Sequence, residues 1–274
     1  MELRVGAVSY LNAKPLYHRL REFAPAVRLT LDYPSILADL LKRGELDVAL
    51  IPSIEYLRGV ERGYEILPGF AIAAHGPVRS VKLFSRVPFR DIRRLALDEG
   101  SRTSQALCRI WLAKRHGVLP TCIESLPMGV PAQESMADAV MLIGDRAMRD
   151  PNGFVESVDL AEAWYEMTAL PFVFALWVAR AGVELGDLPD SLARSKADGL
   201  AHAEELAADN AARLGLDRES CVDYLTNVLS YDLGAPEIAG LRRFAMEAAA
   251  LGLAPRGADL VFHIDRRLNL AQSR

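Results

Sequence analysis

The sequence predicts an α/β protein built from two lobes, and three observations support this fold class. Short apolar runs alternate with amphipathic stretches over the first 50 residues. The same alternation resumes near Phe84, and the chain turns helical from Asp187 onward. A β-α-β-α-β order at the start of the chain favours right-handed crossovers on one side of a sheet.

The first unit contains three expected strands, with a helical segment after each of the first two. The strands are expected over residues 3–8, 27–32 and 47–52. Asn12 is placed to cap the first helix, and Pro34 opens the second, which Gly44 ends. The third strand is apolar throughout, which is typical of a strand buried on both faces of a parallel sheet.

The second unit repeats this pattern, and a helical tail follows it. Its strands are expected over residues 95–97, 122–126, 139–143 and 170–180. Its helices are expected from residue 101 to Gly117 and over residues 159–166. An apolar stripe between residues 192 and 214 predicts one long amphipathic helix in the tail, with two more over 218–230 and 235–251.

No flexible linker separates the two units, so the chain is expected to cross between the lobes on structured segments. We expect the crossings over residues 75–84 and 172–180. Lobe 1 then comprises residues 1–83 and 177–274, and lobe 2 comprises residues 84–176. A ligand cleft is expected at the junction between the lobes.

Composition and charge exclude several classes of protein. The 274 residues carry 32 basic and 36 acidic side chains, a net charge of −4, with no basic block, so we expect no nucleic-acid partner. The longest apolar run, 170–179, is about half of what a membrane-spanning helix needs, and the N-terminus lacks a signal-peptide pattern. We therefore expect a cytoplasmic protein without membrane partners.

The motif search favours a small-molecule site without a metal or cofactor. The three cysteines at 108, 122 and 221 are scattered, and no pair of histidines has metal-ligand spacing along the sequence. Phosphate-loop, dinucleotide and nucleophile-elbow motifs are absent as well. We expect three reduced, mostly buried thiols.

Two loops are the best candidates for binding a small anion. Asn12 follows the first strand, where its amide either contacts a substrate or caps a helix. Residues 100–105 combine a glycine, three hydroxyl side chains and Arg102 at a helix start, where free N–H groups attract negative charge. The same segment also fits a simple helix cap through Ser101. Asp145 ends a strand, either as a ligand contact or as a cap.

Six segments in order resemble the menaquinone-biosynthesis family of the futalosine route, most closely its chorismate dehydratase branch. They are SYLNAKPL (9–16), GELDVALIPSIEY (44–56), GPVRSVKLFSRVP (76–88), SRTSQAL (101–107), AVMLIGDRAM (139–148) and WYEMTALPFVFALWVAR (164–180). The resemblance implies a type II periplasmic-binding-protein-like fold, with mixed sheets flanked by helices and a helical C-terminal segment packed on lobe 1. It also implies a lyase without cofactor that dehydrates chorismate, a dicarboxylate, to 3-[(1-carboxyvinyl)oxy]benzoate.

The resemblance also assigns roles to residues. Asn12 and Ser80 are implied as catalytic residues, with Ser101, Arg102, Thr103 and Ser104 as a carboxylate clamp. The full set of implied substrate-binding residues is Ser9, Tyr10, Ser101, Arg102, Thr103, Ser104, Gly144, Asp145, Pro171 and Phe172. No protein group is assigned as the general base, and a substrate carboxylate is hypothesised to take the proton.

Two alternative functions and one question of assembly stay open at this point. The sister branch, 1,4-dihydroxy-6-naphthoate synthase, is similar in outline. A non-catalytic protein that closes on a small anion is the other alternative. The apolar C-terminal helices either form the face of a homodimer or complete the core of lobe 1.

Overall fold

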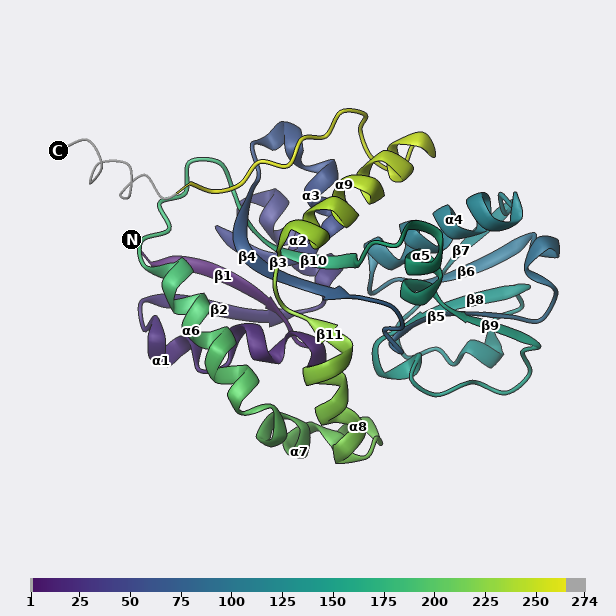
Figure 1. Cartoon of the computed structure of the whole chain (residues 1–274), viewed down its shortest axis with the longest axis horizontal. Coiled ribbons are helices and arrows are strands. Elements are labelled where there is room, and N and C mark those ends of the chain that lie inside the picture. Colours follow the sequence, from purple (N-terminus) through teal and green to yellow (C-terminus); the bar gives the residue numbers. More distant parts are fainter. Residues whose placement is uncertain (1, 265–274) are drawn as a thin grey trace.

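The computed structural model describes residues 2–264, without the side chains of Asp145 and Arg213, and it has two lobes that lie side by side (Figure 1). Each lobe is a mixed β-sheet flanked by helices. The fold class expected from the sequence is confirmed.

Lobe 1 is built on a six-stranded sheet in the order β11-β4-β10-β3-β1-β2. The strands are β1 (Leu3–Val8), β2 (Val27–Asp32), β3 (Val48–Pro52), β4 (Glu65–Ala74), β10 (Phe172–Ala179) and β11 (Leu229–Ser230). The first three strands are parallel, whereas β10 runs antiparallel to both β3 and β4. Every residue of β3 and β10 is buried, as expected for strands covered on both faces.

Lobe 2 is built on a five-stranded sheet in the order β7-β6-β8-β5-β9. The strands are β5 (Val81–Ser85), β6 (Arg94–Asp98), β7 (Cys122–Leu126), β8 (Ala139–Ile143) and β9 (Glu156–Asp159). The helices α4 (Arg102–His116) and α5 (Leu160–Thr168) belong to this lobe. The polar strand β9 was not expected, because its sequence lacks an apolar alternation.

The remaining α-helices of the described residues and the 3-10 helix η1 belong to lobe 1. They are η1 (Leu11–Tyr17, a 3-10 helix), α1 (Leu20–Phe23), α2 (Pro34–Arg43), α3 (Ser53–Arg58), α6 (Leu188–Ala201), α7 (Ala203–Leu214), α8 (Arg218–Asp223) and α9 (Ala235–Ala250). The single long helix expected over residues 192–214 is wrong, because the chain bends at His202 between α6 and α7. Likewise, the helix expected over 218–230 ends as a π-helical turn, Tyr224–Val228, which leads into β11.

The chain crosses between the lobes at two short segments. It leaves the sheet of lobe 1 after β4 and enters that of lobe 2 at β5, so the first crossing is residues 75–80. The second crossing, residues 169–171, joins α5 to β10. The expected boundaries at 83/84 and 176/177 fall inside β5 and β10, each of which lies wholly in one sheet. The apolar run of β10 was recognised, whereas β5 was expected only as part of a crossing segment, because sheet membership is not visible in sequence.

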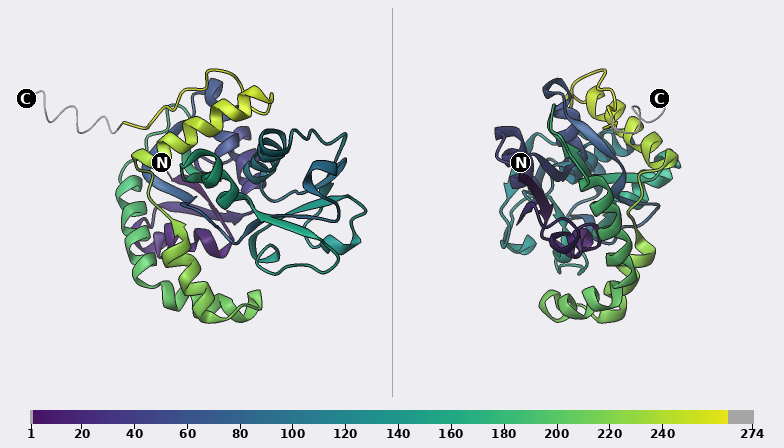
Figure 2. Two further views of the ribbon diagram at one scale, coloured as in Figure 1. Left: turned by 45° about the vertical axis from the view of Figure 1, so that its right-hand side comes forward. Right: turned by 90° about the vertical axis from the view of Figure 1, so that its left-hand side faces the viewer.

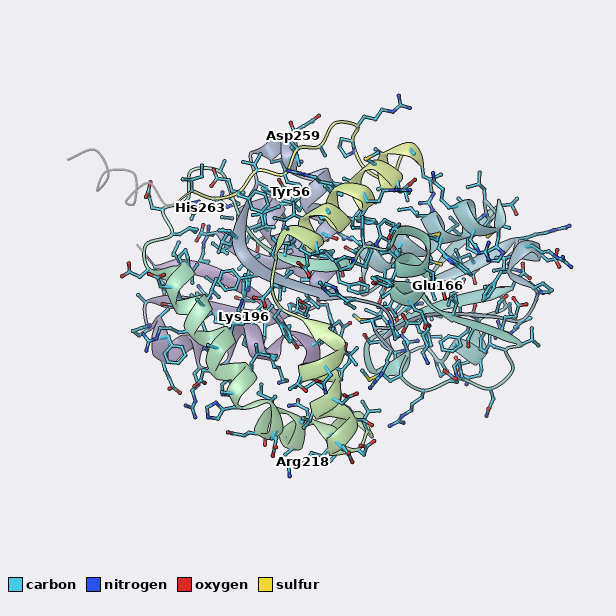
Figure 3. All side chains as sticks on the ribbon, viewed as in Figure 1. Tyr56, Glu166, Lys196, Arg218, Asp259 and His263 are labelled. Atoms are coloured by element: carbon cyan, nitrogen blue, oxygen red, sulfur yellow. The ribbon has the colours of Figure 1, made fainter. Side chains whose placement is uncertain are left out.

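The C-terminal part of the chain completes the core of lobe 1. Helix α9 packs on α3 and β10, and Phe244 of this helix stacks edge-on against Phe172. The segment after α9 runs back along α3 and β4, where the Tyr56 hydroxyl donates to the main-chain oxygen of Asp259 at 3.1 Å (Figures 2 and 3). Among residues 2–264, no helix has the length and apolarity needed to cross a bilayer.

Candidate active site between the lobes

A pocket lies where the strand ends of the two lobes face each other. The carboxyl ends of β1 and β3 border it from lobe 1, and those of β6 and β8 approach it from lobe 2, the usual position of ligand sites in α/β proteins. Its lining is Val8, Tyr10, Pro34, Pro52, Ile72, Ser80, Val81, Ser101, Ser104, Ile143, Gly144, Phe174 and Ala175. The cavity measures about 50 Å³, which is room for a few water molecules and too little for a ring-sized ligand in this arrangement of the lobes.

The N-terminus of α4 supplies two serine hydroxyls to this pocket. Ser101 caps the helix, because its Oγ accepts from the Ser104 N–H at 3.3 Å, and the two hydroxyl oxygens are 2.9 Å apart. The capping interpretation of this segment is therefore confirmed. Both serines also line the pocket, and the positive end of a 15-residue helix favours a bound anion there.

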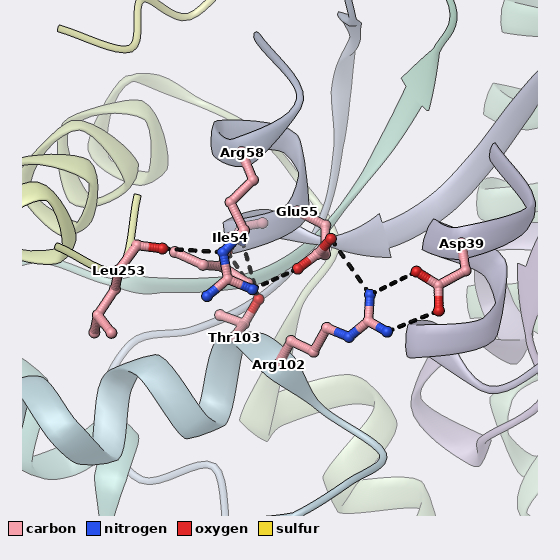
Figure 4. Close-up of polar contacts among 8 residues, drawn as sticks. Asp39, Ile54, Glu55, Arg58, Arg102, Thr103 and Leu253 are labelled. Carbon is pink, nitrogen blue, oxygen red and sulfur yellow. Dashed lines mark hydrogen bonds and ion pairs between the residues drawn. The ribbon is translucent and has the colours of Figure 1, made fainter. Parts of the chain in front are cut away.

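Arg102 and Thr103, expected in the same clamp, point toward lobe 1 and do not line the pocket (Figure 4). The Arg102 guanidinium donates to both carboxylate oxygens of Asp39, at 2.9 and 2.8 Å, and lies 3.4 Å from Glu55. This contact holds the pKa of Asp39 below its ordinary value. Thr103 is buried, and its hydroxyl oxygen accepts from the Ile54 N–H at 3.2 Å. Both side chains thus join the lobes.

Ser80 lies on the first crossing segment and is buried in the pocket wall. The hydroxyl of Tyr224, from the π-helical turn of lobe 1, donates to Ser80 Oγ at 2.7 Å. Because the oxygen of Ser80 accepts this bond, its own proton is free to be donated to another group. The preceding residue, Arg79, pairs at 2.6 Å with Asp223, which ends α8 directly before the π-helical turn. Two adjacent residues of the tail therefore hold the crossing segment. Sequence reasoning missed Tyr224, which sits in the helical tail without a motif.

Asn12 does not cap a helix, and that expectation is wrong. The 3-10 helix η1 begins after Tyr10, and Asn12 lies inside it. The Asn12 amide oxygen is buried and has no hydrogen-bond partner among the described residues. A buried acceptor without a partner is costly, which favours a role toward a ligand. Asn12 is two residues beyond Tyr10, which lines the pocket, but it is not itself in the lining.

Tyr10 reaches from lobe 1 to lobe 2 across the pocket. Its hydroxyl lies 3.6 Å from the sulfur of Met128. Gly100 permits this approach, because a Cβ at that position would lie 2.8 Å from the Tyr10 hydroxyl oxygen. The glycine of the predicted anion loop is therefore required for close packing between the lobes.

A buried carboxylate supports the loop behind the pocket. Asp98 ends β6, and its oxygens accept from the Gly100 N–H at 2.9 Å and from Arg146 at 3.2 Å. Burial raises the pKa of Asp98, while the Gly100 bond and Arg146 partly oppose that shift.

Gly144, expected in the site, lines the pocket with a φ of 61° and donates its N–H to the Ser80 main-chain oxygen at 2.8 Å. The Asp145 side chain lies outside the described part of the structure.

Three further residues that were expected in the site, Ser9, Pro171 and Phe172, are not in the pocket lining. Ser9 donates its N–H to the main chain of Asp32 at 3.1 Å. Phe172 is buried in an aromatic cluster of lobe 1, and the carbonyl of Pro171 packs directly against α9. The residue that β10 presents to the pocket is Phe174.

The fold agrees with comparisons to known proteins. A family model described as menaquinone biosynthesis matches residues 3–250. The chain belongs to this family. A chorismate dehydratase from Thermus thermophilus is 35% identical over 269 residues, covering 92% of this chain and 96% of that protein. A chorismate dehydratase from Campylobacter jejuni is 25% identical, covering 91% and 99%.

Solved structures place this family member among periplasmic-binding-protein-like folds. A protein from Archaeoglobus fulgidus superposes with a TM-score of 0.71 at 19% identity, covering 92% of this chain and 98% of that one. The periplasmic aliphatic sulphonate binding protein SsuA from Escherichia coli gives 0.61 at 15% identity, covering 96% and 92%. At these identities the likeness shows the fold alone.

Proposed function

We propose that this protein is a chorismate dehydratase, a lyase that removes one water from chorismate to give 3-[(1-carboxyvinyl)oxy]benzoate. The observation that carries the proposal is 35% identity to the Thermus thermophilus chorismate dehydratase over nearly the whole of both chains. The pocket supports it, because Tyr10, Ser80, Ser101 and Ser104 bring hydroxyl groups from both lobes to one cavity.

The two substrate carboxylates need hydrogen-bond donors and a positive potential. The N-terminus of α4, with the hydroxyls of Ser101 and Ser104, supplies both for one carboxylate. Arg102 stays bound to Asp39 in this arrangement, so the charge at the clamp comes from the helix and not from a guanidinium. Neutral donors of this kind hold an anion without a competing counter-ion.

The reaction removes a hydrogen from the ring carbon that bears the enolpyruvyl ether and the hydroxyl from the adjacent carbon. Together they leave as water, and the ring becomes aromatic. Ser80 is oriented by Tyr224 to donate a hydrogen bond to the substrate, and the amide of Asn12 assists the departing hydroxyl. A carboxylate of the substrate takes the ring proton and passes it to the departing hydroxyl, which leaves as water. Aromatisation supplies the driving force, so positioning is the main task of the protein, and it can contribute about 7–11 kcal/mol.

Purified protein mixed with chorismate, without added metal or cofactor, tests this function. Chromatography with mass detection should show an aromatic product one water lighter than chorismate. Asn12→Ala and Ser80→Ala should lower kcat by about tenfold or more, which corresponds to at least about 1.4 kcal/mol. Ser157→Ala is the matched control, because Ser157 is an exposed serine on β9 far from the pocket lining, and it should retain full turnover.

Two other outcomes would replace the proposal. If chorismate returns unchanged while the substrate of 1,4-dihydroxy-6-naphthoate synthase is turned over, the protein belongs to that sister branch. If both compounds return unchanged but chorismate raises the melting temperature, the protein is a small-anion-binding protein. Full turnover in Asn12→Ala would remove Asn12 from the mechanism and leave the dehydratase assignment standing.

A further inference from the structure

Two histidines and one aspartate meet at the joint between α6 and α7. His18 follows η1, Asp198 lies in the last turn of α6, and His202 is the residue between α6 and α7. One ring nitrogen of each histidine and one carboxylate oxygen all lie within 4.8 Å of one another. None of these residues belongs to the pocket between the lobes.

The hydrogen bonds of the described residues do not satisfy all the polar atoms of this cluster. Nε2 of His18 and Oδ2 of Asp198 are buried and 3.4 Å apart, yet neither has a hydrogen-bond partner among the described residues. Buried polar atoms almost always have a hydrogen-bond partner. Two buried atoms that face each other without such a partner therefore indicate a binding site for a third group. A cation between them satisfies both lone pairs at once.

The spacing fits a transition-metal ion. Two ligands held at about 2.0–2.1 Å from a tetrahedral ion lie about 3.3–3.4 Å apart, which matches the separation of His18 Nε2 and Asp198 Oδ2. Asp198 and His202 are four residues apart at a helix end, so both side chains project from the same face.

The tautomer of His202 also suits a metal ligand. Its Nδ1 is 2.7 Å from the main-chain oxygen of Asp198, and since a carbonyl only accepts, Nδ1 is the donor. The neutral ring then keeps its lone pair on Nε2, the nitrogen that can bind a metal. Nδ1 also lies 3.6 Å from Oδ1 of Asp198, so the ring packs directly against the carboxylate.

We propose that His18, Asp198 and His202 form a binding site for one Zn²⁺ ion, with solvent completing the coordination. Nitrogen and carboxylate ligands in this number are the set that Zn²⁺ prefers, whereas Mg²⁺ prefers oxygen ligands alone. Among the described residues, Arg19 is the one cation other than the histidines that forms an ion pair with the cluster, with its guanidinium 3.8 Å from Oδ1 of Asp198. Its side chain is 41% exposed, so it can swing into solvent when the ion binds.

The bound ion would link η1 to the joint between α6 and α7, because its ligands come from both. These elements already pack closely, because Gly199 lets α6 rest on the backbone of Pro15. Asn12 lies on the same 3-10 helix, six residues before His18. Bound Zn²⁺ therefore stabilises the segment that carries Asn12 without entering the reaction.

Calorimetric titration of EDTA-treated, dialysed protein with ZnCl₂ tests the site directly and independently of turnover. One equivalent should bind and raise the melting temperature, whereas MgCl₂ should do neither. His18→Gln and Asp198→Asn should each weaken Zn²⁺ binding by about tenfold or more. His116→Gln is the matched control, because His116 ends α4 in the other lobe, and it should bind like the parent protein.

Each other outcome overturns the proposal. Absence of binding would mean that His18 and Asp198 form only a proton-dependent ion pair. Binding that survives both substitutions would place the ion elsewhere, for instance at the exposed Cys122. If either variant is less folded by circular dichroism, His202→Asn, at the partly exposed helix joint, replaces it, and unchanged affinity there counts against the site.

Discussion

Replacing Tyr224 by phenylalanine removes one hydroxyl group and tests whether the helical tail takes part in catalysis. The hydroxyl donates to Ser80 Oγ at 2.7 Å, and both side chains are only 3% exposed. Losing a buried hydrogen bond of this kind costs about 1–2 kcal/mol. If Ser80 must be oriented in the transition state, kcat falls by about five- to thirtyfold.

The assay is steady-state turnover of chorismate by the parent protein and by Tyr224→Phe, with melting curves for both. Tyr56→Phe is the matched control, because the Tyr56 hydroxyl is also buried and bonded, but to Asp259 and Val261 at the back of lobe 1. That control should lose stability and keep kcat. A Tyr224→Phe variant with the kcat of the parent protein would refute the argument that Tyr224 positions Ser80.

Three further predictions concern stability and reactivity. The Arg4 guanidinium holds the pKa of Asp47 well below its ordinary value. The ionised Asp47 therefore stabilises the folded protein above about pH 4, and this contribution is lost as the pH falls further. In urea unfolding, the stability of Asp47→Asn should fall less between pH 5 and pH 2 than that of the parent protein. Gly199→Ala should lower the melting temperature, because its Cβ would lie 2.5 Å from Pro15 and overpacking costs about 1–3 kcal/mol. Maleimide should label Cys122 alone in native protein, since the other two cysteines are buried; peptide mapping checks this.

Local signals explain which elements were predictable. The bounds of β1, β2, β7 and β8 agree with the sequence prediction, because each is a short run limited by charged or turn residues. The ends of α2 were also predictable, since Pro34 begins it and Gly44, with a φ of 76°, ends it. The break at His202 was not predictable, because the apolar stripe continues through it; in the structure the helices on both sides of the break pack on η1.

The site residues that could be predicted lie in loops that carry a recognisable motif. Tyr10, Ser80, Ser101 and Ser104 were expected from their motifs and do line one pocket. Tyr224 acts from 144 residues away through a turn that only the assembled fold brings to the crossing segment. No local pattern marks such a partner.

Arg102 shows why neighbours in a motif need not share a function. Successive residues of a helix point about 100° apart, so a motif at a helix start sends its side chains in different directions. Ser101 and Ser104 face the pocket, whereas Arg102 faces Asp39 and Glu55 of lobe 1. These bonds form only when the lobes are together, and the pocket is too small for a ring in that state. Separating the lobes to admit a substrate would break the Arg102 contacts, so the arginine stabilises the closed arrangement and does not line the pocket.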